Sequence, residues 1–162
     1  MSYALSIDLV QPFDEVVPQV KQALAANGFG IVSEIDMQKT LKEKIGVEIE
    51  PQLILGACNP RFANRALQVE PSIGLLLPCN VVVRHTAGVT VVEAINPETL
   101  VTLTENPALA ALAKELSAAL NASLVTEEFY RDAGKMRDAQ YRLAELERDL
   151  ADANKQWEEW VG

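Results

Sequence analysis

Hydrophobic and polar residues alternate at the start of the chain, which is the pattern of a strand with one buried face. This alternation predicts a strand over residues 3–10, with its hydrophobic positions at Tyr3, Leu5, Ile7 and Leu9. Further β-rich runs predict strands over residues 29–34, 52–58, 73–85 and 88–95. The last two strands flank a short turn around Gly88 and are expected to form a hairpin.

Hydrophobic residues at helical spacing predict helices between these strands. The first stripe consists of Phe13, Val16, Val17, Val20 and Leu24. Asp14 is expected to cap this helix and Gly28 to end it. Asp36 is expected to cap a short second helix that ends at Gly46.

Two Asn-Pro pairs indicate further helix starts, because asparagine accepts hydrogen bonds from free amides and proline suits the first helical position. Asn59 is expected to begin a helix that runs to about Glu70, and Asn106 to begin another. The stripe of the later helix consists of Leu109, Leu112, Ala113, Leu116 and Leu120. This order of elements favours an α+β domain, with an antiparallel or mixed sheet covered on one face by helices.

Three sequence blocks carry a family resemblance: GFGIVSEIDMQKTLKEKIG, LILGACNP with the following RFANRAL, and LLLPCNVVV. They resemble the conserved blocks of the domain of unknown function 302 family, and the similarity covers roughly residues 1–122. The resemblance implies a fold of the TATA-box-binding-protein-like type, with a curved antiparallel sheet, helices on one side and frequent dimers. It implies no activity, since function depends on sites rather than folds.

The chain beyond this domain shows a heptad pattern over residues 126–162, which predicts a long C-terminal helix. The a positions are Phe129, Met136, Leu143, Leu150 and Trp157, and the d positions are Asp132, Ala139, Leu146, Ala153 and Trp160. Such a helix would be ~50 Å long. We expect it to pair with a second copy as a coiled coil, and the alternative is an intramolecular hairpin with the helix over residues 107–122.

Composition and charge narrow the class of protein. The 162 residues are 49% hydrophobic and 23% charged, as in a globular protein, and the net charge is -9. An acidic chain disfavours nucleic acid and membrane surfaces as partners. No apolar run reaches the ~20 residues that span a bilayer, and the N-terminus lacks the basic and small-residue features of a leader. With only two cysteines, we expect a cytoplasmic protein with free thiols.

The candidate chemistry lies around the two cysteines, each of which is followed by asparagine. Cys58 directly precedes the Asn59 cap, where free amides and the positive end of the helix dipole stabilise a thiolate. Arg61 and Arg65, one turn apart, suggest a nearby carboxylate or an anionic ligand. The alternative is that Cys58 is a small buried hydrophobic residue and that the arginines pair with Glu34 or Asp36.

The second cysteine pair is Cys79 and Asn80. Cys79 alternates in phase with Ile73, Leu75, Leu77, Val81 and Val83, which predicts that it faces the core, unless a bulge at Pro78 redirects it. His85 would lie ~20 Å away along a regular strand. Two cysteines alone supply fewer ligands than zinc requires, so no metal site is predicted, and no cofactor is indicated.

Common enzyme motifs are absent from the sequence: it has no glycine-rich phosphate loop, no GxSxG and no HExxH. The leading hypothesis is a small cytoplasmic binding or regulatory domain, homodimeric, with a pocket between sheet and helices. Its candidate anion or small-ligand site lies near the Cys58 helix start. One alternative is a thiol-dependent redox or sulfur-handling protein, in which Cys58 reacts and Cys79 resolves. Another is a structural adaptor that acts through its helical tail.

Overall fold

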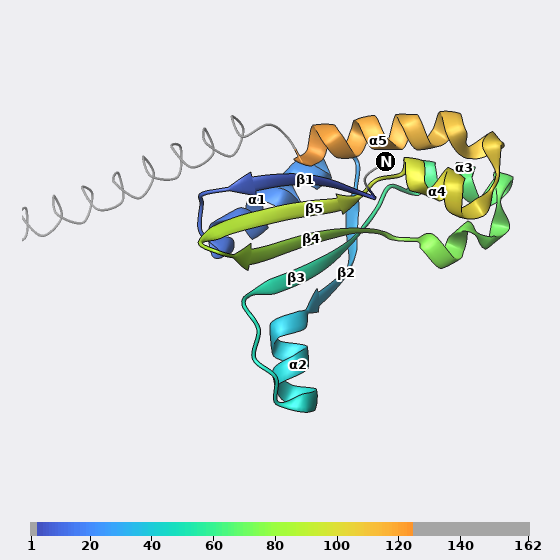
Figure 1. The fold of residues 1–162 in the computed structure, drawn as a ribbon. Coiled ribbons are helices and arrows are strands. Elements are labelled where there is room, and N and C mark those ends of the chain that lie inside the picture. The colour runs from blue at the N-terminus through green and yellow to red at the C-terminus, as the bar shows by residue number, and fades with distance from the viewer. Residues whose placement is uncertain (1–2, 125–162) are drawn as a thin grey trace, which may run out of the picture. The chain divides into compact units, whose positions relative to one another are not determined.

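The computed structural model describes residues 3–124, and the predicted C-terminal helix with its heptads lies outside these residues (Figure 1). The described chain forms an α+β fold around a five-stranded sheet. The strands are β1 (Ala4–Leu9), β2 (Gly30–Asp36), β3 (Gln52–Cys58), β4 (Cys79–Thr86) and β5 (Val89–Ile95). Their order is β1-β5-β4-β3-β2, and every neighbouring pair is antiparallel. The predicted fold class is confirmed, and the sheet is antiparallel rather than mixed.

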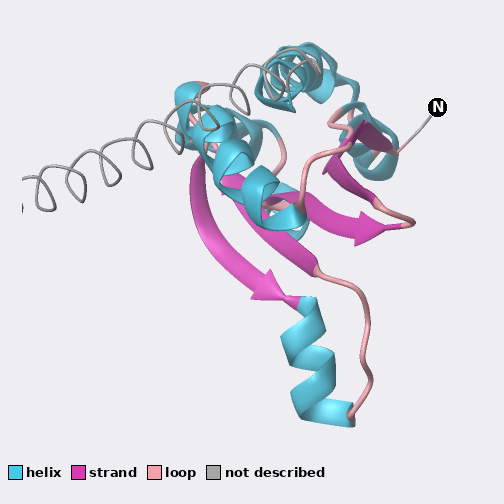
Figure 2. Cartoon of the chain, turned by 90° about the vertical axis from the view of Figure 1, so that its left-hand side faces the viewer, coloured by secondary structure: helices cyan, strands magenta, loops and turns pink. Residues whose placement is uncertain are grey.

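Helices α1 (Phe13–Ala26) and α5 (Ala110–Leu124) cover one face of this sheet. The other helices are α2 (Met37–Ile45), α3 (Pro60–Val69) and α4 (Glu98–Thr104), with 3-10 helices η1 (Pro71–Leu76) and η2 (Pro107–Leu109). Figure 2 shows α1 and α5 together on one side of the curved sheet, whereas α2 projects beyond the ends of β2 and β3. The other face of the sheet is not covered by any described helix.

The main core lies between the sheet and helices α1 and α5. Its fully buried side chains are Leu55, Val81, Val83 and Val92 from the strands and Val16, Val20, Leu24 and Leu120 from the helices. A second buried cluster joins α3, η1, α4, η2 and the start of α5, and consists of Ala66, Ile73, Leu100, Leu109 and Leu112.

Most predicted helix ends are found where the capping residues placed them. The Asp36 side chain accepts a hydrogen bond from the Lys39 amide at 2.8 Å, and Gly46 ends α2 in the left-handed conformation at φ 69°. The expected cap of α1 is wrong, because Pro12 occupies the N-cap position. Asp14 lies instead in the first turn, where its charge still favours the positive end of the helix dipole.

The predicted strand over residues 73–85 is too long at its start. Residues Pro71–Leu76 form η1, whose first turn is capped by the Glu70 side chain, which accepts a hydrogen bond from the Ser72 amide at 3.3 Å. Ile73 is buried, but Leu75 is 89% exposed, so the alternating hydrophobic residues there do not share a face. The strand begins only at Cys79, after Pro78.

Candidate functional site

A cavity of about 30 Å³ lies at the junction of the two buried clusters, where β3 and β4 meet α3 and α5. Both cysteines line it. Cys79 is paired with Ala57 in the β3–β4 ladder, and Cys58 is the residue after Ala57, so the two thiols come from adjacent positions on neighbouring strands. The predicted pocket between sheet and helices therefore has a counterpart in the structure, with two thiols in its wall.

The remaining wall of the cavity is hydrophobic apart from Asn59. It includes Phe29, Phe62, Ala63, Ala66, Ile73, Leu77, Leu100, Leu109, Leu112, Ala113 and Leu116. A helix-by-helix reading of the sequence finds some of these residues, because Leu109, Leu112 and Leu116 belong to the predicted stripe. Leu100 belongs to α4, a helix that was not predicted, and no pattern in the sequence indicates that its side chain reaches this site.

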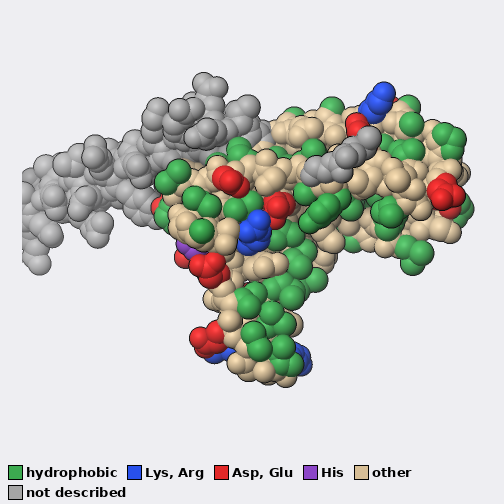
Figure 3. Space-filling model, viewed as in Figure 1, with side chains coloured by type: hydrophobic (Ala, Val, Ile, Leu, Met, Phe, Trp, Pro, Cys, Tyr) green, Lys and Arg blue, Asp and Glu red, His purple; other side chains and the backbone are tan. Residues whose placement is uncertain are grey.

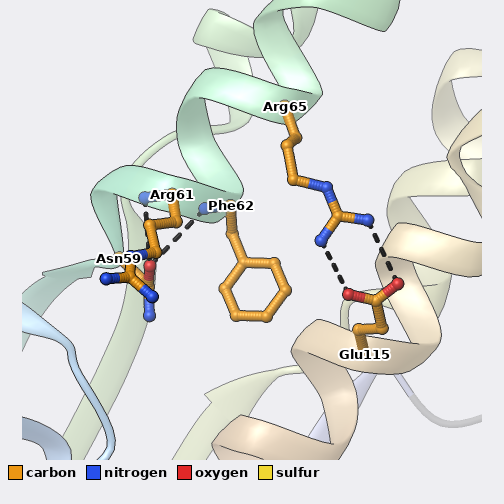
Figure 4. Close-up of polar contacts among 5 residues, drawn as sticks. All are labelled: Asn59, Arg61, Phe62, Arg65 and Glu115. Carbon is orange, nitrogen blue, oxygen red and sulfur yellow. Dashed lines mark hydrogen bonds and ion pairs between the residues drawn. The ribbon is translucent and has the colours of Figure 1, made fainter.

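Asn59 builds the edge of the cavity at the start of α3. Its side-chain oxygen accepts hydrogen bonds from the amides of Arg61 and Phe62 at 3.1 and 3.5 Å, as the Asn-Pro pair predicted (Figure 4). The turn that ends α1 lies close by, because a Cβ atom on Gly28 would be 3.1 Å from the Asn59 Nδ2 atom. Cys58 is half-buried at this edge, and Cys79 is buried deeper.

Burial changes the acidity of the inner thiol. The pKa of Cys79 is raised from its ordinary 9.0 to about 11, mainly because the buried site disfavours a thiolate. The negative charge of a Cys58 thiolate raises it further. Both cysteines are free, and Cys79 is therefore a neutral thiol at physiological pH.

Arg65 forms an ion pair with Glu115 across the helices, and Figure 4 shows the two side chains pointing toward each other. Its terminal nitrogens donate to the carboxylate at 2.7 and 3.1 Å, from α3 to α5. This hydrogen bonding lowers the pKa of Glu115 and raises the pKa of Arg65. The sequence suggested a nearby carboxylate, but the two named partners were wrong: Glu34 binds Lys21 at 2.7 Å, and Asp36 caps α2.

The predicted site residues thus divide into two groups. Cys58, Asn59 and Cys79 share the cavity. Arg61 is exposed and does not line it, and Arg65 is held by its carboxylate partner. Asn80 points to the opposite face of the sheet, as strand alternation requires after the inward-facing Cys79.

The chemistry available in the cavity is that of two thiols in an apolar wall. Within residues 3–124, no group of three or more histidine, cysteine, aspartate or glutamate side chains is arranged to hold a metal ion. His85 lies near the other end of β4 from Cys79. Hydrophobic contact and thiol chemistry are therefore the interactions that this site offers to a ligand.

Comparison with known proteins gives a family and a fold relative. The crystal structure of an uncharacterized conserved protein DUF302 from Bacillus stearothermophilus is 29% identical in sequence and superposes with a TM-score of 0.73. The similarity covers 76% of this chain and 97% of that chain. No curated protein matches the sequence. Among the described helices, none has the length and apolarity to cross a membrane. The family described as "Domain of unknown function DUF302" matches residues 5–126, and this chain belongs to it.

Proposed function

We propose that this protein is a small-ligand binding domain with a regulatory role, and that its ligand is a small neutral, apolar molecule held in the cavity between the sheet and α3 and α5. The observation that carries the proposal is the composition of the cavity wall. Apart from Asn59 at the edge, the groups that face the space are hydrophobic side chains and the thiols of Cys58 and Cys79.

A neutral ligand fits this site better than the anion that the arginines suggested. The first amides of α3 are already bonded to the Asn59 side chain, and both terminal nitrogens of Arg65 are bonded to Glu115. Arg61 is exposed and lies outside the cavity wall. An anion in the cavity would lose its hydration without gaining a matching charge.

Water is a poor occupant of the same space. A volume of about 30 Å³ is large enough for water, but a buried water needs two to four polar partners. Thiols are weak hydrogen-bond donors and acceptors, so they do not meet this requirement. Displacing poorly held water by an apolar group is favourable, which supports binding of an apolar molecule.

The proposal includes a homodimer in the cytoplasm. The support for a cytoplasmic protein is that both cysteines are free thiols, the usual state in a reducing compartment. The support for a dimer is the heptad pattern of the sequence, which lies outside the described residues.

The cavity can be tested with xenon as the probe, followed by NMR of methyl groups in the full-length protein. We expect saturable shifts at Ile73, Leu109 and Leu112, which surround the cavity. Ala63→Leu would fill the cavity and should abolish these shifts, whereas the same substitution at the exposed Ala118 should preserve them. Absence of shifts in the unmodified protein, or equal shifts in the Ala63→Leu variant, would contradict the proposal.

A second candidate is reversible thiol oxidation, which is favoured by the presence of both cysteines in one cavity wall. In this reaction two thiols lose two protons and two electrons to hydrogen peroxide, a disulfide forms, and two water molecules are released. After peroxide treatment, mass spectrometry should show that the protein has lost the mass of two hydrogen atoms. The Cys58→Ser variant should show no such loss. Overoxidation of Cys58 without a disulfide would exclude Cys79 as its resolving partner.

A further inference from the structure

The uncovered face of the sheet carries a hollow of about 300 Å³ that is separate from the thiol cavity. It is lined mainly by outward-facing residues of the three inner strands β3, β4 and β5, and by Tyr3 and Ala4 at the start of β1. Strand pairing holds its members in register, because Gln52 lies opposite Arg84, and Val82 lies opposite Glu93. Figure 3 shows this face, with acidic and basic side chains next to each other on the sheet and hydrophobic side chains around them.

Two amide side chains in the hollow have no partner in the described part of the chain. Neither Gln52 nor Asn80 forms a side-chain hydrogen bond to any residue within 3–124. The sheet holds both backbones in place, since Gln52 is paired with Arg84 and Asn80 with Gly56 in the β3–β4 ladder. Each amide offers a donor and an acceptor in one plane. The hollow therefore presents polar groups whose bonding capacity the fold leaves unused.

The charged residues of the hollow neutralise each other. Arg84 donates from Nε to Glu93 at 2.9 Å, and both side chains are about two-thirds buried, with exposures of 33% and 30%. That bond uses one guanidinium nitrogen and one carboxylate oxygen, Oε2. Terminal nitrogens of Arg84 and the second carboxylate oxygen remain as further donors and an acceptor. The nearby Asp8 charge, which adds to the raised pKa of Arg84, disfavours an anion at this place.

We propose that this hollow binds a neutral polyhydroxylated molecule of the size of a monosaccharide. Each sugar hydroxyl donates and accepts at once, which matches the in-plane donor and acceptor pairs of the amides and of the Arg84–Glu93 pair. Val82 and Ile95 form an apolar floor, and the ring of Tyr3 is available at the edge for the C–H face of a sugar. The volume is at the lower end of the range for small-ligand sites.

The test is an NMR titration of the ¹⁵N-labelled full-length protein with D-glucose, D-galactose and D-mannose at millimolar concentrations. Side-chain amide signals of Gln52 and Asn80 and the Nε–H signal of Arg84 should shift saturably with at least one hexose. Asn80→Ala should weaken that binding by about five- to tenfold, the equivalent of one neutral hydrogen bond. Gln68→Ala, which removes an exposed amide on α3, is the matched control and should leave the affinity unchanged.

Three outcomes would overturn the proposal. In the first, none of the hexoses shifts the three signals. In the second, sodium acetate shifts them and binds with higher affinity than every hexose, which would identify an anion site. Equal weakening by Asn80→Ala and Gln68→Ala would show that the shifts do not report on the hollow. Because Asn80 is exposed and points away from the core, its replacement should keep the fold, and the unmodified protein decides the first two outcomes by itself.

Discussion

The Cys79 thiol is predicted to make the fold less stable as the pH rises from 9 to 11. Its pKa is about 11 in the folded protein and 9.0 when unperturbed, because the side chain is only 4% exposed. Between these two pH values the unfolded chain releases the proton that the folded chain retains. Stability that is fully present below pH 9 is therefore lost as the pH rises through 11.

The size of this effect follows from the shift of the pKa. The pKa of Cys79 rises from 9.0 to about 11, which is about two pH units, and each unit corresponds to 1.36 kcal/mol. The free energy of unfolding should therefore fall by about 3 kcal/mol. A single domain has only ~5–15 kcal/mol of stability, so the loss is readily measured.

The assay is urea unfolding of the protein and of its Cys79→Ala variant at pH values from 8 to about 12. Other titrating groups affect both proteins alike, so the difference between the two free energies isolates the Cys79 thiol. We expect this difference to shrink by about 3 kcal/mol across the range. Cys58→Ala is the control. Its free energy of unfolding should show most of the same decline with pH, because burial is the larger cause of the raised Cys79 pKa. A difference that stays constant with pH would refute the assignment of a buried neutral thiol.

Three other outcomes test the fold and the tail. Gly56→Ala places a Cβ atom 2.8 Å from Pro78 Cγ and should cost about 1–3 kcal/mol in urea unfolding, whereas Gly30→Ala, with its nearest contact at 3.9 Å, should not show that steric loss. Glu115→Gln should be less stable than the unmodified protein at neutral pH. This difference in the free energy of unfolding should disappear as the pH falls below 4.5, the ordinary pKa of glutamate, because the ion pair lowers the Glu115 pKa. Leu143→Asp should reduce the sedimentation coefficient if the heptads pair between chains; an unchanged value would argue against pairing.

The sequence predicted the strand positions well, because the β-rich runs are bounded by turn and capping residues. It failed where an alternating pattern arises for another reason. Ile73, Leu75 and Leu77 alternate as in a strand, but Pro71 and the Glu70 cap form a 3-10 helix there. Local hydrogen bonds decided this segment, and hydrophobic spacing alone does not reveal them.

The helix α4 was missed for a related reason. Its sequence ETLVTLT is rich in β-branched residues, which have low helix propensity. The helix is instead started by Asn96, whose side chain accepts a hydrogen bond from the Glu98 amide at 3.1 Å, while Thr99 Oγ1 donates to the Asn96 carbonyl at 2.6 Å. Leu100 on this helix is one wall of the cavity, so the missed helix also hid part of the site.

The two Cys-Asn pairs look alike in the sequence, yet the backbone gives them different surroundings. Cys79 and Asn80 are consecutive in β4, so they face opposite sides of the sheet, one toward the thiol cavity and one toward the open-face hollow. Cys58 ends β3 and Asn59 caps α3, and this change of backbone direction lets both residues line the cavity. The same two residue types therefore contribute to one site at residues 58–59 and to two sites at residues 79–80. Substituting Asn59 would alter the cavity, whereas substituting Asn80 would alter only the opposite face.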